Sequence, residues 1–246
     1  MRGYEPSSYG DGIADVYDDW YDQLEVDAPV ETLARLAGAG PVLELGIGTG
    51  RLALPLAARG LSVSGVDASA AMVQQLRAKP GGDRIDVVVG DMAGREPAGP
   101  FSLVFAAVNT FFNLTVPGAQ PACFEAVATR LVPGGWFVVE AFVPDPDQAG
   151  DGVRVRSLAA DRVVLTVTST DVADQRAYGQ IVELVDGQPV RLRPWSVRWA
   201  TPEQLDAMAT AAGLTLRHRW SNWEGAAFGP DSVRHVSAWR RIADLG

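Results

Sequence analysis

Cysteine, histidine and lysine are scarce in this chain. Its 246 residues include one cysteine, Cys123, two histidines, His218 and His235, and a single lysine, Lys79. One cysteine excludes a disulfide within the chain and favours a reducing, cytoplasmic location. Zinc and iron sites take most of their ligands from cysteine and histidine, so we expect no metal centre. Cys123 lies in the periodic apolar segment 122–131, which predicts a buried small side chain.

Long apolar runs and an excess of positive charge are also absent. No run approaches the roughly 20 apolar residues needed to cross a bilayer, so we expect no membrane-spanning helix. The N-terminal segment is polar and carries no signal-peptide pattern. A net charge of −9 argues against a nucleic-acid substrate, because binding to phosphates requires a basic surface. The composition, 47% hydrophobic and 21% charged, is that of a globular protein.

The most informative segment is Val42–Gly50, an apolar strand that runs into a loop with glycine at positions 46, 48 and 50. Glycine lets the backbone turn sharply and approach a ligand where a Cβ would collide. The next residues, Arg51–Gly60, predict a helix that ends at a glycine. A strand, a glycine turn and a helix N-terminus together form a small-molecule site at the carboxyl edge of a parallel sheet.

The spacing of these glycines separates two classes of cofactor. Dinucleotide-binding folds use G-x-G-x-x-G, whereas here the third glycine follows after one residue and an acid, Glu44, precedes the loop. The segment therefore resembles motif I of the class I S-adenosylmethionine-dependent methyltransferases, which implies S-adenosylmethionine as the cofactor. Glu44 is then either a cofactor ligand or a structural acid that supports the loop, and we favour loop support together with a position near the amino-acid end of the cofactor. The loop contacts implied by the resemblance come from Glu44, Gly46, Ile47, Gly48 and Gly50.

Further matches to this family follow in the expected order. Leu61–Asp67 is a second predicted strand that ends in an acid, and a carboxylate at a strand tip can accept both hydroxyls of a ribose. Ser69 is a predicted N-cap for the helix that follows. Ile85–Val89 and Phe101–Val108 are predicted as the third and fourth strands, and residues 131–143 as a turn and the fifth strand.

The resemblance also implies cofactor roles for residues that follow these strands. It places Asp91 near the adenine amino group and Met92 against the ring. Met72 is expected beside the adenine, with ordinary helix core as the alternative. Asn109, at the tip of the fourth strand, is expected in the pocket. The cofactor-binding residues implied beyond the glycine loop are Tyr17, Asp67, Ala68, Met72, Asp91, Met92 and Asn109.

The pattern of elements predicts an α/β fold. We expect a Rossmann-like class I methyltransferase sheet, mostly parallel, with a terminal antiparallel hairpin. After a break at Val143–Asp147, strand-like segments and the turn residues Asp186 and Gly187 predict an inserted antiparallel β cover. Thr201 and Pro202 predict the start of a helix. The expected parts are an N-terminal helical arm at 1–40, a cofactor-binding core at 41–143, the β cover at 144–200, and a helix and hairpin completing the core at 201–246.

A narrower resemblance is to the amino-sugar N-methyltransferases of antibiotic biosynthesis. The segment Tyr9–Asp18 is similar to the N-terminal arm of that subfamily, in which two tyrosines line the cofactor and sugar pocket. The resemblance implies acceptor-pocket roles for Tyr9, Tyr17 and Asn113, the last at a position where one member type carries histidine. The subfamily commonly has Ala-Cys-Gly-Thr-Gly where this chain has Gly46–Gly50. The resemblance to this subfamily also implies a nucleotide-linked or natural-product-linked sugar as acceptor and a possible homodimer.

The sequence offers no evident catalytic base. His218 and His235 both lie in the predicted closing hairpin, away from the loops that face the methyl group in the family, and ordinary strand positions are expected for them. A hydroxyl acceptor usually needs a base, whereas an amine needs only to arrive neutral. The lack of a base therefore favours methylation of an amine, or O-methylation of a group that is already acidic. We favour N-methylation of a small molecule, an amino sugar in particular. The alternatives are a small-molecule O-methyltransferase, a non-catalytic partner subunit that keeps the fold, and a nicotinamide-dependent oxidoreductase.

Two features of the C-terminal half leave their roles open. Tryptophans concentrate there, and they suit either the wall of a sugar pocket or an ordinary core. Arginines in residues 151–200 suit a diphosphate, but acidic residues in the same stretch nearly balance them. A solvated strand face is the expectation for those arginines.

Overall fold

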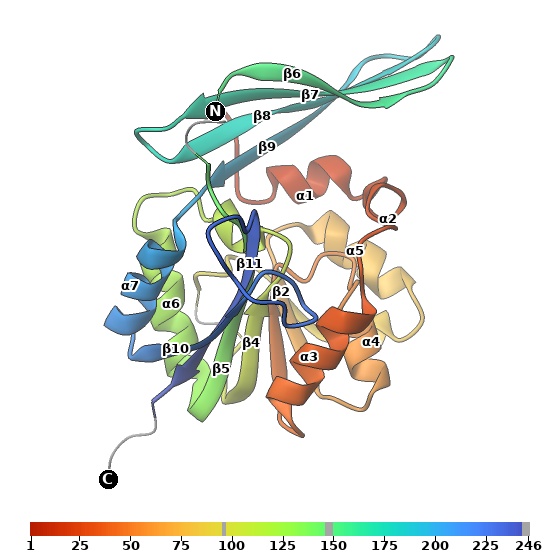
Figure 1. The fold of residues 1–246 in the computed structure, drawn as a ribbon. Helices are drawn as coiled ribbons and strands as arrows, with labels where there is room; N and C mark the ends of the chain where they lie inside the picture. The colour runs from red at the N-terminus through yellow and green to blue at the C-terminus, as the bar shows by residue number, and fades with distance from the viewer. Residues whose placement is uncertain (95–96, 146–149, 243–246) are drawn as a thin grey trace.

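The described residues form two separate sheets in the computed structural model, which covers residues 1–94, 97–145 and 150–242 (Figure 1). The larger sheet has seven strands in these residues. Its spatial order is β10 (Leu214–Trp220), β11 (Arg234–Arg241), β5 (Leu131–Phe142), β4 (Phe101–Ala106), β1 (Val42–Leu45), β2 (Val63–Asp67) and β3 (Asp86–Val89).

The larger sheet is parallel except at one edge. β1 pairs in parallel with β2 and β4, and β4 in parallel with β5, while β11 runs antiparallel to both β5 and β10. The predicted mostly parallel sheet with a terminal antiparallel hairpin is thereby confirmed. The fifth strand is longer than expected, because it already begins at Leu131 and includes the predicted turn.

Helices cover both faces of this sheet because neighbouring strand residues point to opposite sides. Val42 contributes to the core under α3 (Asp27–Ala37), α4 (Ala53–Ala58) and part of α5 (Ala70–Ala78). Leu43 contributes to the core under α6 (Ala119–Arg130) and α7 (Pro202–Ala211). Since α3 packs on the sheet, only the first part of the expected arm is separate from the α/β body.

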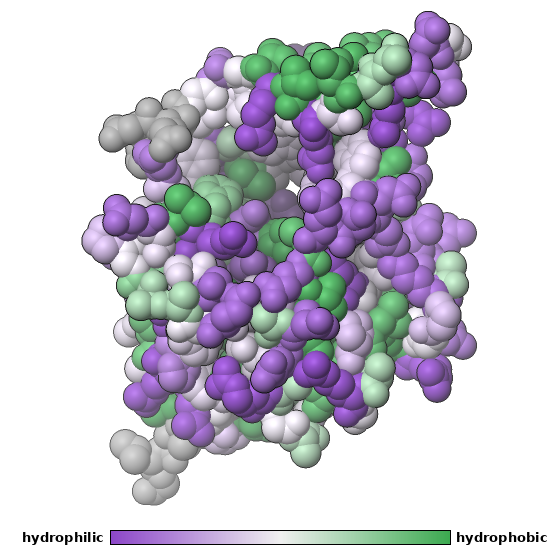
Figure 2. Space-filling model, turned by 45° about the vertical axis from the view of Figure 1, so that its right-hand side comes forward, coloured by the Kyte–Doolittle hydropathy of each residue, from purple (hydrophilic) through white to green (hydrophobic). Residues whose placement is uncertain are grey.

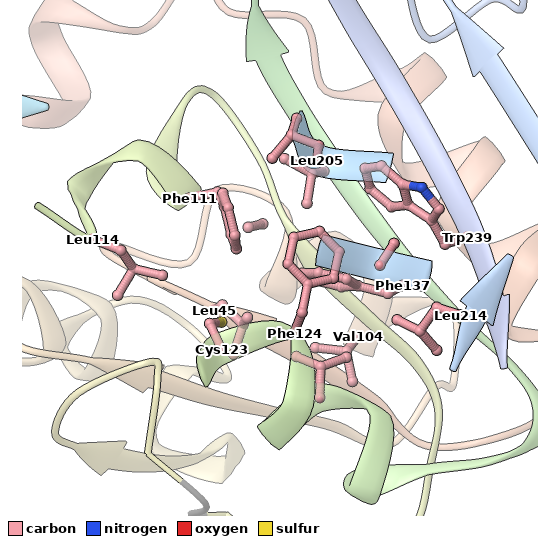
Figure 3. Close-up of a cluster of buried hydrophobic side chains, with 14 of the residues drawn as sticks. Leu45, Val104, Phe111, Leu114, Cys123, Phe124, Phe137, Leu205, Leu214 and Trp239 are labelled. Atoms are coloured by element: carbon pink, nitrogen blue, oxygen red, sulfur yellow. The ribbon is translucent and has the colours of Figure 1, made fainter. Parts of the chain in front are cut away.

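Aromatic side chains fill the core beneath α6 and α7 (Figure 3). The Phe124 ring lies 5.1 Å from that of Phe137 and 5.4 Å from that of Trp239, both edge-on, a favourable arrangement for aromatic pairs. Cys123 is fully buried beside them, as predicted. This packing fixes β5 and β11 relative to α6.

Side-chain caps begin two of the helices where the sequence predicts. Ser69 Oγ accepts a hydrogen bond from the Met72 amide at 3.1 Å and caps α5. Thr201 caps α7 together with Gln204, whose side chain accepts from the Thr201 amide at 2.8 Å. Such caps satisfy backbone amides that the first helical turn leaves unpaired.

The smaller sheet is an antiparallel meander of β6 (Gly152–Leu158), β7 (Arg162–Asp171), β8 (Arg176–Val185) and β9 (Arg191–Arg198). This second sheet lies above the carboxyl edge of the larger one, at the top of Figure 1. The inserted antiparallel cover is therefore present as expected. Residues 146 and 147 of the predicted break lie outside the described residues.

The N-terminal arm lies between the two sheets as α1 (Ser8–Ile13) and α2 (Tyr17–Trp20) (Figure 1). Toward the second sheet, the buried Arg193 pairs with Asp15 at 2.6 Å and with Glu183 at 3.0 Å. Toward the body, Asp18 pairs with Lys79 at 2.7 Å. The arm is therefore held from both sides.

Candidate active site

The glycine loop after β1 needs its three glycines for two different reasons. All have positive φ, +70° at Gly46, +54° at Gly48 and +81° at Gly50, a conformation that side chains rarely adopt. A Cβ at Gly46 would collide with Thr110, and one at Gly50 with Leu76. A Cβ at Gly48 would meet no atom closer than 4.0 Å. Gly48 alone of the three keeps a space beside it clear.

Asp67 joins this loop to the next βα turn. Its Oδ2 accepts a hydrogen bond from the Gly48 amide, and its Oδ1 accepts one from the Ser69 amide, both at 2.8 Å. Burial raises the pKa of Asp67, while these two hydrogen bonds act to lower it. Each carboxylate oxygen retains capacity to accept from a further donor. The acid therefore lies at the tip of β2 with acceptor positions still available.

A cavity of about 550 Å³ opens in front of this loop, a size typical of small-molecule sites. Its walls come from the arm, the tips of β1, β2 and β3, and the segment after β4. The residues predicted from the sequence that line it are Tyr9, Tyr17, Gly46, Gly48, Asp67, Ala68, Met72, Asp91, Met92 and Asn113.

Three residues expected in the cofactor site lie behind the cavity wall. Ile47 packs over Gly65 and Gly50 packs against Leu76 of α5, so both shape the loop from below. Glu44 is buried under the loop, and desolvation raises its pKa to about 8 against the opposing effect of Arg51. Sequence patterns could not separate lining from supporting residues, because both sit in one nine-residue motif.

A second cavity of about 270 Å³ adjoins the first. The second sheet contributes Arg154, Arg156, Thr166, Ile181, Trp195 and Val197, and the arm contributes Tyr21. Figure 2 shows the hollow between the second sheet and the α/β body. Asn109 lines this cavity and not the larger one, and its Oδ1 accepts from the Phe142 amide at 2.7 Å.

The two cavities share part of their walls. Tyr9, Tyr17, Thr110 and Asn113 line both. Thr110 is a residue that sequence reasoning missed, and its place after Asn109 in the segment beyond β4 was the available signal. The shared wall is where a molecule in one cavity would touch a molecule in the other.

The tyrosines of the shared wall are neutral at physiological pH. Burial raises the pKa of Tyr17 to about 12 and that of Tyr9 well above its usual range. The Tyr9 and Tyr21 hydroxyl oxygens lie 3.1 Å apart and form a hydrogen bond. These hydroxyls can donate and accept hydrogen bonds, but they are poor bases in this state.

Neither histidine lines either cavity. The His218 ring stacks with Trp136 and Trp220 in the closing hairpin. His235 is buried, and desolvation lowers its pKa to about 4. Among the described residues there is no cluster of three or more His, Cys, Asp or Glu side chains that could hold a metal ion. In the same part of the chain no helix is long and apolar enough to span a bilayer.

Comparisons with known proteins agree with this geometry. The sequence profile of a family described as "Methyltransferase domain" matches residues 42–135. The CcbJ methyltransferase of Streptomyces caelestis is 38% identical, with a TM-score of 0.89 and coverage of 98% of this chain and 100% of that one. The cypemycin N-terminal methyltransferase of a Streptomyces species is 29% identical over 219 residues, 86% of this chain and 89% of its own length.

A more distant solved structure has the same fold. The sugar N-methyltransferase KedS8 of a Streptoalloteichus species is 21% identical, with a TM-score of 0.70 and coverage of 98% of this chain and 99% of that one. The chain belongs to the class I S-adenosylmethionine-dependent methyltransferases, and it is an enzyme that uses S-adenosylmethionine as methyl donor. A nicotinamide-dependent oxidoreductase is thereby excluded.

The residues present fit this donor. Gly48 leaves space at the wall where any side chain would intrude, and Asp67 offers buried acceptor oxygens beside it. Beneath the loop, Glu44 Oε2 is buried with no hydrogen-bond partner among the described residues. Of these two acids only Asp67 lines the cavity, and its acceptor oxygens suit a ligand that carries hydroxyl donors.

Proposed function

We propose that this methyltransferase N-methylates an amine of a small, sugar-sized acceptor in secondary metabolism. The larger cavity holds the donor and the smaller one the acceptor. The observation that carries the proposal is the wall that the two cavities share, formed by Tyr9, Tyr17, Thr110 and Asn113. It supports contact between a donor in one cavity and an acceptor in the other, beside neutral hydroxyl and amide groups.

Several residues that line the larger cavity have a proposed contact with S-adenosylmethionine. Asp67 accepts the ribose hydroxyls, and Asp91 and Met92 lie at the adenine, with Met72 packing beside it. The backbone of the loop at Gly46 and Gly48 lies against the amino-acid end. Glu44 acts from below as a support of the loop, buried at the end of β1 beneath it.

Methyl transfer from a sulfonium is an in-line displacement. The acceptor lone pair forms a bond to the methyl carbon while the carbon–sulfur bond breaks, and its electrons stay on sulfur. Orientation supplies most of the acceleration, and good near-attack geometry contributes roughly 7–11 kcal/mol. The aromatic and amide groups of the shared wall restrict the acceptor to such an orientation.

None of the four residues in the shared wall is a base at neutral pH, which favours nitrogen over oxygen as the acceptor atom. Tyr9 and Tyr17 hold their protons at neutral pH, and both histidines lie elsewhere. A neutral amine attacks without prior deprotonation and loses its extra proton to solvent afterwards. The 29% identity to a methyltransferase named for a peptide N-terminus also supports nitrogen as the acceptor atom.

The size of the smaller cavity favours a sugar over a peptide. Its volume of about 270 Å³ lies just below the usual range for drug-sized ligands, and the arm and second sheet enclose it. A nucleotide-linked or natural-product-linked amino sugar is the acceptor we propose. A homodimer and a cytoplasmic location remain predictions from the sequence.

The proposal is tested with labelled S-adenosylmethionine and a panel of acceptors. The panel holds a thymidine-diphosphate-linked amino sugar, the methyl glycoside of that sugar, the same glycoside with hydroxyl in place of the amine, and a short peptide with a free N-terminus. Mass spectrometry and NMR locate the methyl group. We expect methyl on the sugar nitrogen. Methyl on oxygen, on the peptide alone, or no transfer to any member would refute the proposal.

A further inference from the structure

We infer that Arg154 and Arg156 of β6 bind an anionic group of the acceptor, so that the substrate is an amine carrying a phosphoryl or carboxylate group. Both arginines line the smaller cavity. The inference rests on the proposed assignment of that cavity to the acceptor. The exposed strand face expected from the sequence is present, and in addition two of its arginines line the cavity.

The arginines of the second sheet other than Arg154 and Arg156 all form ion pairs with carboxylates. Arg193 and Arg162 pair with Glu183, Arg191 with Asp15, and Arg198 and Arg176 with Asp174. Among the described residues, Arg154 and Arg156 have no carboxylate oxygen within 4.0 Å. The two unpaired guanidinium groups of this sheet are therefore the two that reach the cavity.

Aromatic rings hold one of these charges in place without neutralising it. The guanidinium of Arg156 lies 4.9 Å from the centre of the Trp20 ring and 5.2 Å from that of Tyr21, within cation–π distance. The strand register shifts between Val155 and Ser157, so Arg156 is the extra residue of a β-bulge. Bulges beside sites redirect side chains, and here the redirected side chain packs on the arm.

The remaining walls of the smaller cavity carry no opposing charge. Among the described residues its lining includes two arginines and no aspartate or glutamate. Trp195 also lines it, and the Trp195 indole N–H is buried without an acceptor in this part of the chain. The protein as a whole carries a net charge of −9, so the excess of cations and hydrogen-bond donors around this cavity does not reflect the overall composition.

The geometry suits a diphosphate or a carboxylate. Arg154 and Arg156 lie close together on β6 and both side chains line the same cavity, so their two guanidinium groups can flank one anion. Arginine binds phosphoryl and carboxylate groups through paired N–H donors. Both arginines are exposed, which places the anion at the mouth of the cavity and leaves the interior for the amine.

Calorimetry on the protein saturated with S-adenosylhomocysteine tests the inference without any need for turnover. One arm compares the thymidine-diphosphate-linked amino sugar with its methyl glycoside. The other compares an amino sugar bearing an amide-linked glycine with the methyl ester of that compound. We expect the anionic member of one pair to bind about tenfold tighter or more, and that pair identifies the anion as phosphoryl or carboxylate.

The double variant Arg154→Gln/Arg156→Gln should lose this preference and keep the wild-type affinity for S-adenosylhomocysteine. Arg191→Gln is the matched control, because it removes an exposed arginine of the same sheet that does not line the cavity. Equal binding of both members in both arms, or a preference that survives in the double variant, overturns the inference. Methyl transfer to oxygen with an arginine-dependent preference would refute the proposed amine and leave the anion site standing.

Discussion

The two sheets of this protein build their parts of the site in different ways. The larger sheet contributes consecutive strand tips to the larger cavity, which we propose for the donor, with Gly46 and Gly48 of the loop and the acid Asp67. The second sheet lines the smaller cavity, which we propose for the acceptor, with side chains from several strands, and tyrosines of the arm complete that lining. A site formed by backbone atoms depends on one backbone conformation and tolerates little change in it. A wall formed by side chains can change its chemistry through single substitutions. On the proposed assignment of the two cavities, recognition of the donor and recognition of the acceptor are separable.

The largest expected effect follows from closing the space beside the loop. Gly48→Val places a side chain in the donor cavity, so binding of S-adenosylhomocysteine should be lost in calorimetry. The matched control is Gly60→Val. Gly60 has a φ of +87° with no atom near its Cβ position, so this variant bears the same backbone strain away from the cavity. Normal binding by Gly48→Val would place the donor elsewhere.

The buried acid under the loop predicts a pH-dependent stability. Burial raises the pKa of Glu44 from 4.5 to about 8, so the folded state keeps a proton that the unfolded state releases. The contribution of this proton to the free energy of unfolding is fully present below pH 4.5. It is lost progressively as the pH rises from 4.5 to about 8. The decline is at most about 1.4 kcal/mol per pH unit.

The variant Glu44→Gln should therefore gain stability relative to the wild type as the pH increases across that interval. Denaturant unfolding at several pH values measures the difference. Parallel curves for the two proteins would mean that Glu44 is ionised and paired in the folded state, for instance with Arg51.

The ribose assignment predicts an intermediate effect. Asp67→Asn removes the charge at the tip of β2 and should weaken S-adenosylhomocysteine binding by about 1–3 kcal/mol, the contribution of charge-assisted hydrogen bonds. Asp86→Asn, at the opposite end of the neighbouring strand β3, should leave affinity unchanged. If Asp67→Asn and Asp86→Asn bind S-adenosylhomocysteine with the same affinity in calorimetry, Asp67 does not contact the donor.

The smallest expected effect concerns the wall that both cavities share. Tyr17→Phe removes one hydroxyl and should lower kcat/KM for the acceptor by about 1 kcal/mol of transition-state stabilisation, with the fold intact. Tyr178→Phe changes a tyrosine of β8 that lines neither cavity and serves as the control. Wild-type kinetics for Tyr17→Phe would assign this tyrosine to packing of the arm.

The donor side was largely predictable from the sequence because its determinants are local. A glycine with positive φ, an acid at a strand tip and a capping serine act within a few residues of where they stand, as Gly48, Asp67 and Ser69 do. Which loop residues line the cavity and which support the loop from below was not predictable. Gly50 faces Leu76 and Ile47 faces Gly65, contacts that depend on how α5 and β2 pack.

The acceptor side could be predicted only in part. The alternation of residues 152–198 gave the strands, but not which face would turn toward the donor. Arg154 and Arg193 lie on the same sheet and carry the same charge. One lines the cavity and the other is buried between Asp15 and Glu183. The difference arises because the arm, distant in sequence, covers one end of the sheet.

The sequence by itself determined the α/β order, the glycine loop and the acid that follows it, because short-range backbone and side-chain chemistry specifies each of them. The tertiary structure decided where the second sheet lies and which tyrosines and arginines meet at the carboxyl edge. Those contacts join segments more than a hundred residues apart, and their pairing depends on packing that no local pattern encodes.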